Sequence, residues 1–302
     1  MEETQNQTSS QVEGINPLQD TQLSFIGSGV MAEAIIAGLL RQKLVVPSQI
    51  TGSHPRQARR DELHAKYGIH MIESNREAAV LNKFPEKTKC DLPTNSIIVL
   101  AVKPQRLGGV LEDLKGALKP NQLILSIVAG AKIETIAGGL LHSAIVRAMP
   151  NTPAQIGQGI TAWTATDEVG EGQQAQVRAM LVALGREMYV ETERMIDMAT
   201  ALSATGPTYI FMMLESLVDA GVHMGFSRLV SQKLVLQTML GSVLFAMESG
   251  KHPAELRNMV TSPGGTSAEA IYQMEKGSLR TVLSKAVWAA FQRAVALGSR
   301  NS

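Results

Sequence analysis

Two glycines near the N-terminus have the spacing of a nucleotide-binding turn. Gly27 and Gly29 follow the apolar run 23–26 and precede the small Ala32, in the pattern Gly-x-Gly-x-x-Ala. The first glycine permits a tight turn, the second lets a pyrophosphate approach the backbone, and the small residue lets the next helix pack on the strand. Free N–H groups at the start of that helix face the phosphates. An ordinary turn without a ligand is the alternative, but the position at the first strand of an alternating pattern favours a nucleotide.

The residues expected at the end of the second strand indicate which dinucleotide this turn binds. An NAD site needs Asp or Glu there, to bind the ribose 2′-hydroxyl. This sequence has Ser53 and Arg56 instead, and a hydroxyl with a guanidinium suits a 2′-phosphate. We therefore expect NADPH as the cofactor, with NADH as the alternative. Arg59 and Arg60 follow one turn later, and we expect them on the solvated face of the second helix.

Two later strand ends offer further contacts for the same ligand, because open α/β sheets bind ligands where their parallel strands end. Lys103 follows one such strand and precedes Pro104, which is well placed to begin a helix. Lys103 either touches the cofactor or is a solvated loop lysine. The small residues Ala129 and Gly130 end the next strand, where they leave room for a flat nicotinamide.

A second cluster of small and hydroxyl residues lies near the C-terminus. Gly264 and Gly265 stand among hydroxyl residues in the segment 261–267, and a helix is expected from Ser267. Free N–H groups and hydroxyls in such a loop form a nest for an anion such as a carboxylate. A capping loop without a ligand is the alternative, although a cap needs fewer glycines and hydroxyls than this segment contains.

The elements that must position these residues follow two patterns. From residue 22 to about residue 190, short apolar runs alternate with helical patterns, which indicates βαβ units and a mostly parallel sheet. After about residue 191 the strand signals disappear. The fold class is α/β: an N-terminal Rossmann-type doubly wound sheet followed by an all-helical domain. The expected strands are 23–26, 49–52, 97–102, 123–128 and 145–148, and the expected helices include 31–40, 107–118, 194–203, 207–224, 229–249, 267–275 and 279–297.

The stretch 229–247 is apolar nearly all round, so this helix should be buried on most sides. A helical domain of this size cannot bury it alone, and a helical dimer interface would do so. The run 234–247 is too short to cross a bilayer, which takes about 20 apolar residues.

Composition excludes several classes of protein. The 302 residues are 44% hydrophobic and 18% charged, with a formal net charge of +1, so we expect two folded domains and neither a nucleic-acid nor a membrane partner. The single cysteine, Cys90, and six scattered histidines predict neither a disulfide nor a metal site. We expect residues 1–20 to be a disordered tail, residues 82–95 to be a surface loop, and the protein to be soluble and cytoplasmic.

Three further motifs make the pattern specific. Residues 149–154 read Met-Pro-Asn-Thr-Pro-Ala, residues 204–209 read Ala-Thr-Gly-Pro-Thr-Tyr, and residues 261–267 read Thr-Ser-Pro-Gly-Gly-Thr-Ser. They follow the glycine turn and the Ala-Val-Lys-Pro strand end at 101–104. In order and spacing, these five motifs resemble the pyrroline-5-carboxylate reductase family over roughly residues 22–298.

The resemblance implies an NADP-binding Rossmann domain, residues 21–192, and a helical substrate-binding and dimerisation domain, residues 193–302. It implies homodimers, which can assemble into decamers. The implied activity is NAD(P)H-dependent reduction of 1-pyrroline-5-carboxylate to L-proline, the last step of proline biosynthesis, by hydride transfer to the C=N carbon. With Arg56 from the reasoning above, the expected cofactor-binding residues are Gly27, Ser28, Gly29, Val30, Met31, Ser53, Arg56, Asn75, Ala101, Val102, Lys103, Ala129 and Gly130. The implied substrate-binding residues are Glu193, Gly264, Gly265, Thr266 and Ser267.

This reaction asks little of side chains, because the nicotinamide carries the hydride and a protonated imine is already electrophilic. A ketone reductase would need a proton donor for the developing alkoxide, and the sequence offers no convincing His/Asp or Lys/Tyr set. Our hypothesis for the catalytic residue is Ser267, whose hydroxyl would bond the imine nitrogen or orient a water.

Two positions depart from the family pattern. Ala204 stands where glycine is common, and Asn258 stands where an acid is common. They leave two alternatives open. One is another NADPH-dependent imine or hydroxyacid oxidoreductase, for which Lys233 and Lys251 are candidate lysines outside any matching motif. The other is a catalytically inactive, NADPH-binding paralogue with a regulatory role.

Overall fold

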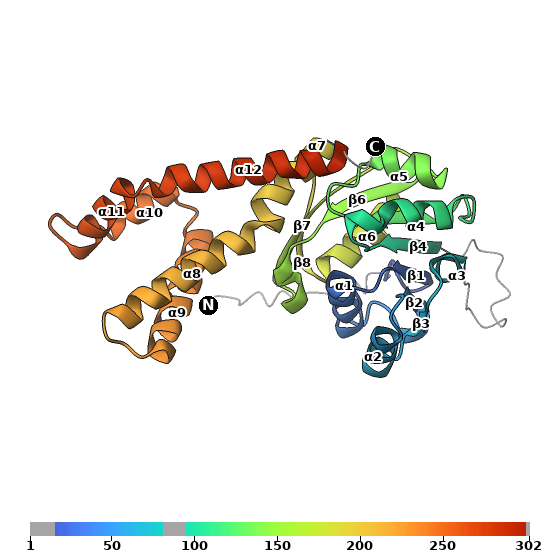
Figure 1. Cartoon of the computed structure of the whole chain (residues 1–302), viewed down its shortest axis with the longest axis horizontal. Coiled ribbons are helices and arrows are strands. Elements are labelled where there is room, and N and C mark those ends of the chain that lie inside the picture. The colour runs from blue at the N-terminus through green and yellow to red at the C-terminus, as the bar shows by residue number, and fades with distance from the viewer. Residues whose placement is uncertain (1–15, 81–94, 300–302) are drawn as a thin grey trace, which may run out of the picture.

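The computed structural model of the chain describes residues 16–80 and 95–299. These residues form a sheet wrapped by helices and a group of helices that extends away from it (Figure 1). Within these two ranges the sheet has eight strands in the order β3-β2-β1-β4-β5-β6-β7-β8. Strands β1 to β6 are parallel, β7 is antiparallel to β6, and β8 is parallel to β7. The expected doubly wound, mostly parallel sheet is confirmed.

All five expected strands are present, with shifted ends. The strands are β1 (Thr21–Ile26), β2 (Ile50–Ser53), β3 (His70–Ile72), β4 (Asn95–Leu100), β5 (Leu123–Ser126), β6 (Ile145–Met149), β7 (Gly159–Ala165) and β8 (Gly185–Tyr189). The sequence did not predict β3, β7 or β8. β3 has only three half-buried residues, β8 is mostly exposed, and β7 mixes Gly, Ala and Thr with its apolar residues instead of forming a branched apolar run.

In the part of the chain that the structure describes, six α-helices cover the two faces of the sheet. They are α1 (Val30–Arg41), α2 (Gln57–Tyr67), α3 (Asn75–Val80), α4 (Leu107–Leu114), α5 (Ile133–Leu140) and α6 (Glu171–Val182). Helices α1, α2 and α6 pack on the face that carries Leu23 and Phe25. Helices α3, α4 and α5 pack on the other face, which carries Ile26 and Ile98. Neighbouring side chains of one strand thus enter different cores, as a sheet covered on both sides requires.

The polar N-terminal segment joins the fold earlier than expected. Leu18 is fully buried, and the Gln49 side-chain amide donates hydrogen bonds to the carbonyl oxygens of Leu18, Gln19 and Thr21. The prediction of a disordered tail reaching residue 20 is therefore wrong for residues 16–20, which the buried glutamine ties to the sheet. Residues 1–15 lie outside the described part of the chain. So does the expected loop 82–95, except for Asn95, which begins β4.

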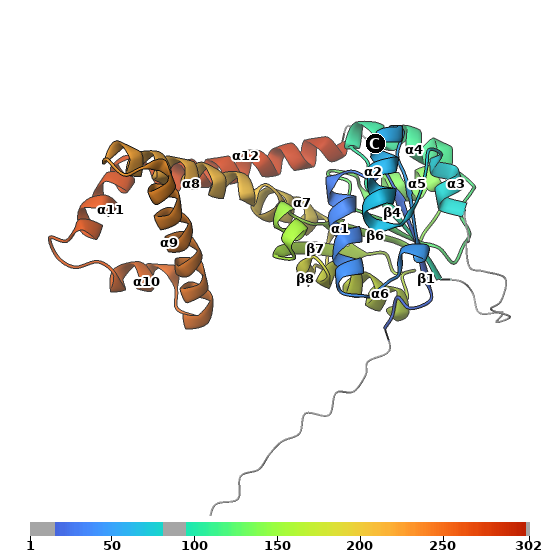
Figure 2. The ribbon, with the colours of Figure 1, turned by 90° about the horizontal axis from the view of Figure 1, so that it is seen from below.

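The remaining elements are helical: α7 (Glu193–Ala199), a π-helical turn (Thr200–Ala204), α8 (Gly206–His223), α9 (Arg228–Ser249), α10 (Pro253–Met259), α11 (Thr266–Lys276) and α12 (Leu279–Ser299). Of these, α10 was not predicted, because it is short and none of its residues is buried. Helix α12 runs back from the far end to the sheet, where it packs beside α7 (Figures 1 and 2).

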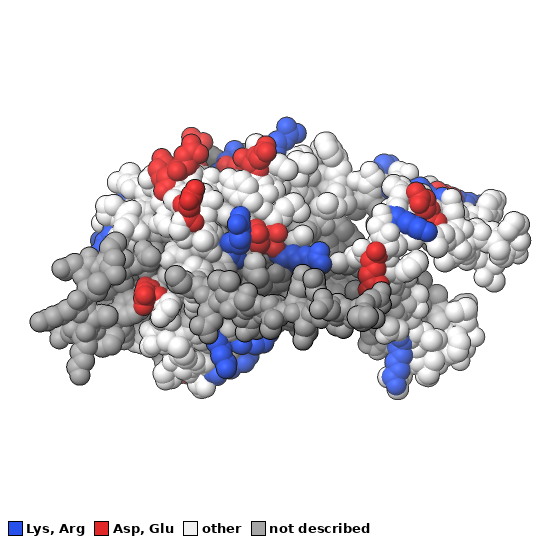
Figure 3. All heavy atoms as spheres, turned by 180° about the vertical axis from the view of Figure 1, so that it is seen from behind, with Lys and Arg blue, Asp and Glu red and all other residues white. Residues whose placement is uncertain are grey.

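Within one chain, α9 does not obtain the burial that its composition predicts. Its apolar side chains are about half exposed, including Leu234 at 53%, Leu240 at 54% and Val243 at 56%. The helix is also longer than the apolar run seen in the sequence. Among the described helices, α9 alone is long and apolar enough to cross a bilayer, judged by length and composition only. On the face seen in Figure 3, broad uncharged areas of the helical part lie between scattered charges of both signs.

Candidate active site

The loops expected to bind the cofactor meet where the parallel strands end, at the carboxyl-terminal side of the sheet, which we call the nucleotide edge. In the strand register Ile26 pairs with Ser53 on one side and with Leu100 on the other, and Leu100 pairs with Ser126. The loops after β1, β2, β4 and β5 therefore start side by side. The strand order reverses at β1, which lies between β2 and β4. A crevice at such a reversal is where open α/β sheets bind ligands.

The two glycines of the first loop have different roles. Gly27 has a φ of +86°, and a Cβ there would lie 2.5 Å from Cγ1 of Val102. The backbone and the close neighbour both require glycine. Gly29 has no heavy atom within 4 Å of the place where a Cβ would be, so the space beside it is open. Helix α1 begins at the exposed Val30 without a side-chain cap, and its first N–H groups suit a pyrophosphate.

The Ser53 side chain supports the glycine turn. The residue is fully buried, its Oγ accepts a hydrogen bond from the Gly27 N–H (3.2 Å), and its hydroxyl donates to Oδ1 of Asn75 (2.8 Å). We expected this hydroxyl to bind a 2′-phosphate; in this structure it forms hydrogen bonds inside the fold, to the glycine turn and to Asn75. Asn75 begins α3 at the same edge. Ser28 is also buried, and its backbone N–H donates a hydrogen bond to the Ser53 carbonyl.

Of the three arginines after β2, Arg56 is the one available to a ligand. It is exposed, and its side chain makes no hydrogen bond or ion pair within residues 16–80 and 95–299. The expectation that Arg59 and Arg60 are solvated is wrong. The side chain of Arg59 is 14% exposed and donates to the Ser28 carbonyl and to Glu33, and that of Arg60 donates to the His54 carbonyl.

Glu33, in the first turn of α1, holds α2 against the glycine turn. Its carboxylate accepts hydrogen bonds from Arg59 (2.5 Å), Lys66 (2.8 Å) and Tyr67 (2.9 Å). Burial alone would raise the pKa of Glu33, but the bonds from Lys66, Arg59 and Tyr67 outweigh it and lower the pKa to about 2. The carboxylate is therefore ionised at neutral pH.

The other expected cofactor residues lie on the loops after β4 and β5. Ala101 and Val102 are half-buried, and Lys103 is exposed beside them. Ala129 is half-buried, but Gly130 is buried under the end of α12, where a Cβ would lie 2.7 Å from that of Leu297. Glycine is thus required at position 130 for the approach of α12, a constraint that the sequence pattern did not show.

A buried ion cluster joins the last parallel strand to the first helix of the helical part. Arg147 on β6 is 1% exposed, and its guanidinium donates to Glu193 (2.7 Å) and Asp197 (2.6 Å) on α7. The same Glu193 oxygen also accepts the N–H of Ile133 (2.7 Å). Sequence reasoning proposed Glu193 and missed Arg147, although a charged residue inside the apolar run 145–148 is a usable signal.

The C-terminal loop has the shape of an anion nest. Gly264 has a φ of +71°, and the Gly265 N–H bonds back to the Ser262 carbonyl (3.0 Å). Helix α11 then starts at Thr266 without a side-chain cap, with Thr266 exposed and Ser267 half-buried. Uncapped N–H groups beside two hydroxyls can bind a carboxylate.

The structure does not bring this nest to the nucleotide edge of the same chain. Helices α10 and α11 lie at the end of the helical part far from the sheet in both ribbon views (Figures 1 and 2). Glu193 lies at the sheet instead, next to the loop after β5. The expectation that the residues 264–267 and Glu193 form one substrate site is therefore not met within a single chain.

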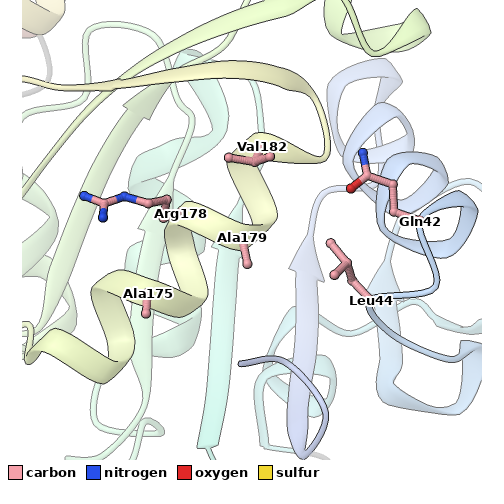
Figure 4. Close-up of a pocket in the computed structure, with 6 residues that line it drawn as sticks. All are labelled: Gln42, Leu44, Ala175, Arg178, Ala179 and Val182. Atoms are coloured by element: carbon pink, nitrogen blue, oxygen red, sulfur yellow. The ribbon is translucent and has the colours of Figure 1, made fainter. Parts of the chain in front are cut away.

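A hollow of about 370 Å³ lies on the outer side of the sheet domain (Figure 4). Gln42 and Leu44, just after α1, line one side, and Ala175, Arg178, Ala179 and Val182 of α6 line the other. Helix α1 starts at the nucleotide edge and runs antiparallel to β1, so its last turn and the hollow next to it lie toward the opposite side of the sheet. It holds none of the expected site residues.

Known proteins resemble the chain in both parts. Residues 193–297 match the family model for pyrroline-5-carboxylate reductase dimerisation, and residues 22–130 match the model described as NADP oxidoreductase, coenzyme F420-dependent. The pyrroline-5-carboxylate reductase of Synechocystis is 40% identical over 92% of this chain and 99% of that protein, and that of Pseudomonas aeruginosa is 37% identical over 92% and 97%. The crystal structure of Plasmodium falciparum pyrroline carboxylate reductase with NADP bound has a TM-score of 0.80 at 32% identity, over 92% of this chain and 98% of that one.

This chain belongs to the pyrroline-5-carboxylate reductase family. As a member it is an oxidoreductase that uses NAD(P)H, and the family's reaction converts 1-pyrroline-5-carboxylate to proline. The match to the reductase dimerisation model covers the helices from α7 onward, so the chain self-associates through this part.

Proposed function

We propose that this chain reduces 1-pyrroline-5-carboxylate to L-proline with NADPH, as the last step of proline biosynthesis. The nucleotide edge carries the proposal: four loops after parallel strands start side by side there, and one of them is a glycine turn that leaves the start of α1 open. When bound, the cofactor supplies a hydride from its nicotinamide ring. The hydride adds to the carbon of the substrate's C=N bond, and the already protonated nitrogen becomes the ring amine of proline.

The charge at the end of β2 supports NADPH over NADH. β2 ends at Ser53, and the following residues contain Arg56 and no Asp or Glu to bind a ribose 2′-hydroxyl. Arg56 is exposed and has no ion pair or side-chain hydrogen bond within residues 16–80 and 95–299, so it can form charge-assisted hydrogen bonds to a 2′-phosphate. Arg59 is held by Glu33 and the Ser28 carbonyl, so it lines the crevice without being free to turn toward the ligand.

The substrate carboxylate, in our proposal, binds the nest formed by Gly264, Gly265, Thr266 and Ser267, with the Ser267 hydroxyl near the imine nitrogen. Because this nest and the nucleotide edge lie at opposite ends of one chain, each site takes its nest from a second copy. The exposed apolar face of α9 supports this arrangement, since a partner has to cover it. We propose the homodimer as the catalytic unit, which can assemble further into decamers.

The same observations support a soluble, cytoplasmic enzyme with neither a nucleic-acid nor a membrane partner. The formal net charge of +1 gives no broad positive field that would attract polyanions. In this proposal the apolar surface of α9 faces another copy of the chain. Light scattering of the purified protein without detergent tests whether the enzyme is soluble, because a membrane-inserted α9 would require detergent for solubility.

The test of the reaction follows NADPH absorbance with purified protein and 1-pyrroline-5-carboxylate, and then repeats it with NADH. We expect rapid oxidation of NADPH and slower oxidation of NADH. A β-keto acid, the oxidised partner of a β-hydroxyacid, is supplied in parallel to test the alternative oxidoreductase. Faster turnover of that ketone would overturn the proposal. Binding of NADPH with no turnover of either substrate would instead identify a regulatory paralogue.

A further inference from the structure

The loop after β5 is held from the helical part at two points. At its far end, the N–H of Ile133, the first residue of α5, donates to Oε1 of Glu193 on α7 (2.7 Å). At its near end, Gly130 lies so close to Gly298 of α12 that a Cβ on Gly298 would be 3.1 Å from the Gly130 oxygen. The first and the last helix of the helical part therefore both contact the short loop that carries Ala129.

Glu193 supplies what the sequence of α5 lacks. The residue before α5, Lys132, gives no side-chain cap, so the first N–H groups of this helix have no local acceptor. A carboxylate at a helix N-terminus satisfies one such N–H and interacts favourably with the helix dipole. Glu193 does this from a different domain, and its side chain is 30% exposed at the nucleotide edge.

Arg147 fixes the orientation of Glu193. The Glu193 oxygen that accepts the Ile133 N–H also accepts from Arg147, whose second nitrogen bonds Asp197 one turn further along α7. The guanidinium is buried, and Arg147 lies on the interior strand β6, where it pairs with Ser126, the last residue of β5. A planar guanidinium with two carboxylates in this geometry leaves the Glu193 side chain little freedom to move away from the loop.

We propose that Glu193, held by Arg147, is a positioning residue that sets the loop 129–133 for the nicotinamide half of the cofactor. The inference rests on the proposed function, because it assumes that the nicotinamide binds next to Ala129 and Gly130. It assigns the helical part a role at the nucleotide edge of its own chain, separate from the nest that it offers to a second copy. The adenosine half, bound at the loops after β1 and β2, does not depend on this contact.

The experiment compares NADP⁺ with 2′,5′-ADP, which lacks the nicotinamide half, by calorimetric binding to the full-length protein. For Glu193→Ala we expect roughly tenfold weaker binding of NADP⁺ and binding of 2′,5′-ADP within about twofold of the original, since only the loop loses its acceptor. Glu193→Gln keeps an oxygen that can accept from Ile133, and we expect it to recover most of the NADP⁺ affinity.

Asp197→Asn is the matched control, because it changes the same ion cluster without touching the loop. We expect its thermal unfolding temperature to fall like that of Glu193→Ala, while its ratio of NADP⁺ to 2′,5′-ADP affinity stays unchanged. Equal weakening of both ligands in Glu193→Ala, or the same altered ratio in Asp197→Asn, would overturn the inference and leave the cluster a purely structural one. Neither binding measurement needs turnover, so absence of reductase activity in the unaltered protein would count against the proposed function alone.

Discussion

The two parts of the chain bury their apolar side chains in different ways. In the sheet domain Phe25, Ile35 and Trp163 are fully buried or nearly so, because helices cover both faces of the sheet. In the helical part Phe211 and Trp288 are each 60% exposed. The first part completes its core alone, and the second, through which the chain self-associates, leaves large apolar side chains exposed. In our proposal the site divides in the same way: the nucleotide edge forms within one chain, and the carboxylate nest reaches it from a partner.

The largest expected effect comes from a charge on the surface that needs a partner. Leu240→Asp places a carboxylate on the exposed apolar face of α9. Burying even a neutral polar group without a hydrogen bond costs on the order of 2–7 kcal/mol, and burying an ionised carboxylate costs more. We expect monomers by light scattering and loss of nearly all turnover. The control, Val182→Asp, alters a 47% exposed residue of α6 in the sheet domain and should leave assembly and turnover intact. Equal behaviour of the two variants would remove the contrast between the two parts.

The second effect is confined to the nucleotide edge. Arg56→Ala removes the exposed guanidinium expected at the 2′-phosphate, and we expect the KM for NADPH to rise roughly 10- to 100-fold, the loss of about 1.5–3 kcal/mol from a charged hydrogen bond. The KM for NADH should stay within about twofold. Arg186→Ala, an exposed arginine on β8, serves as the control and should change neither value. An equal rise in the KM values for NADPH and NADH would mean that Arg56 does not bind the 2′-phosphate.

The third prediction separates the two glycines of the first loop. Gly27→Ala forces a Cβ against Val102 at a positive φ, so we expect the free energy of unfolding to fall by about 1–3 kcal/mol. Gly29→Ala points into open space and should change stability by less than about 0.5 kcal/mol, while it weakens NADP⁺ binding. Urea unfolding and calorimetry measure both quantities. Equal loss of stability in the two variants would contradict the roles assigned to these residues.

The smallest effect is a pH dependence within the sheet domain. The pKa of Glu33 is about 2 in the folded chain, below its ordinary 4.5, so its contribution to stability is complete above about pH 4.5 and is lost as the pH falls toward 2. Allowing for solvent screening, we expect a loss on the order of 1 kcal/mol. Glu33→Gln should flatten this part of the stability profile in urea unfolding at pH 3 and pH 6. An unchanged slope in that variant would assign the effect to other carboxylates.

The sequence predicted the parts of the fold that are marked by strong local patterns. The glycine turn, the five buried strands and the long helices each carry their own signal in apolar period or turn residues. The short β3 and the exposed β8 carry none, because their side chains are not committed to a core. Residues 16–20 look like a polar tail, and only the contact with the distant Gln49 shows that they belong to the sheet.

Predictions for the site were limited by side-chain direction. The pattern placed Ser53 at the nucleotide edge, but it could not show that the hydroxyl turns inward to Asn75. It placed Gly130 at a strand end without showing that α12 packs on it. Arg147 was overlooked because its partners lie on α7, which is 46 and 50 residues away in the sequence and farther than a local pattern spans. Such long-range contacts follow from the packing of the two domains.

The most direct test of the central claim is to assemble mixed dimers from two disabled chains. Gly29→Asp puts a negative charge where the pyrophosphate approaches, and Thr266→Asp puts one at the start of α11, where it repels the substrate carboxylate but suits the helix N-terminus. Each variant alone should be inactive. If every site joins the nucleotide edge of one copy to the nest of the other, co-expressed mixed dimers contain one intact site and recover about half of the original turnover. Mixed dimers as inactive as their parents would show that both halves of a site come from the same chain.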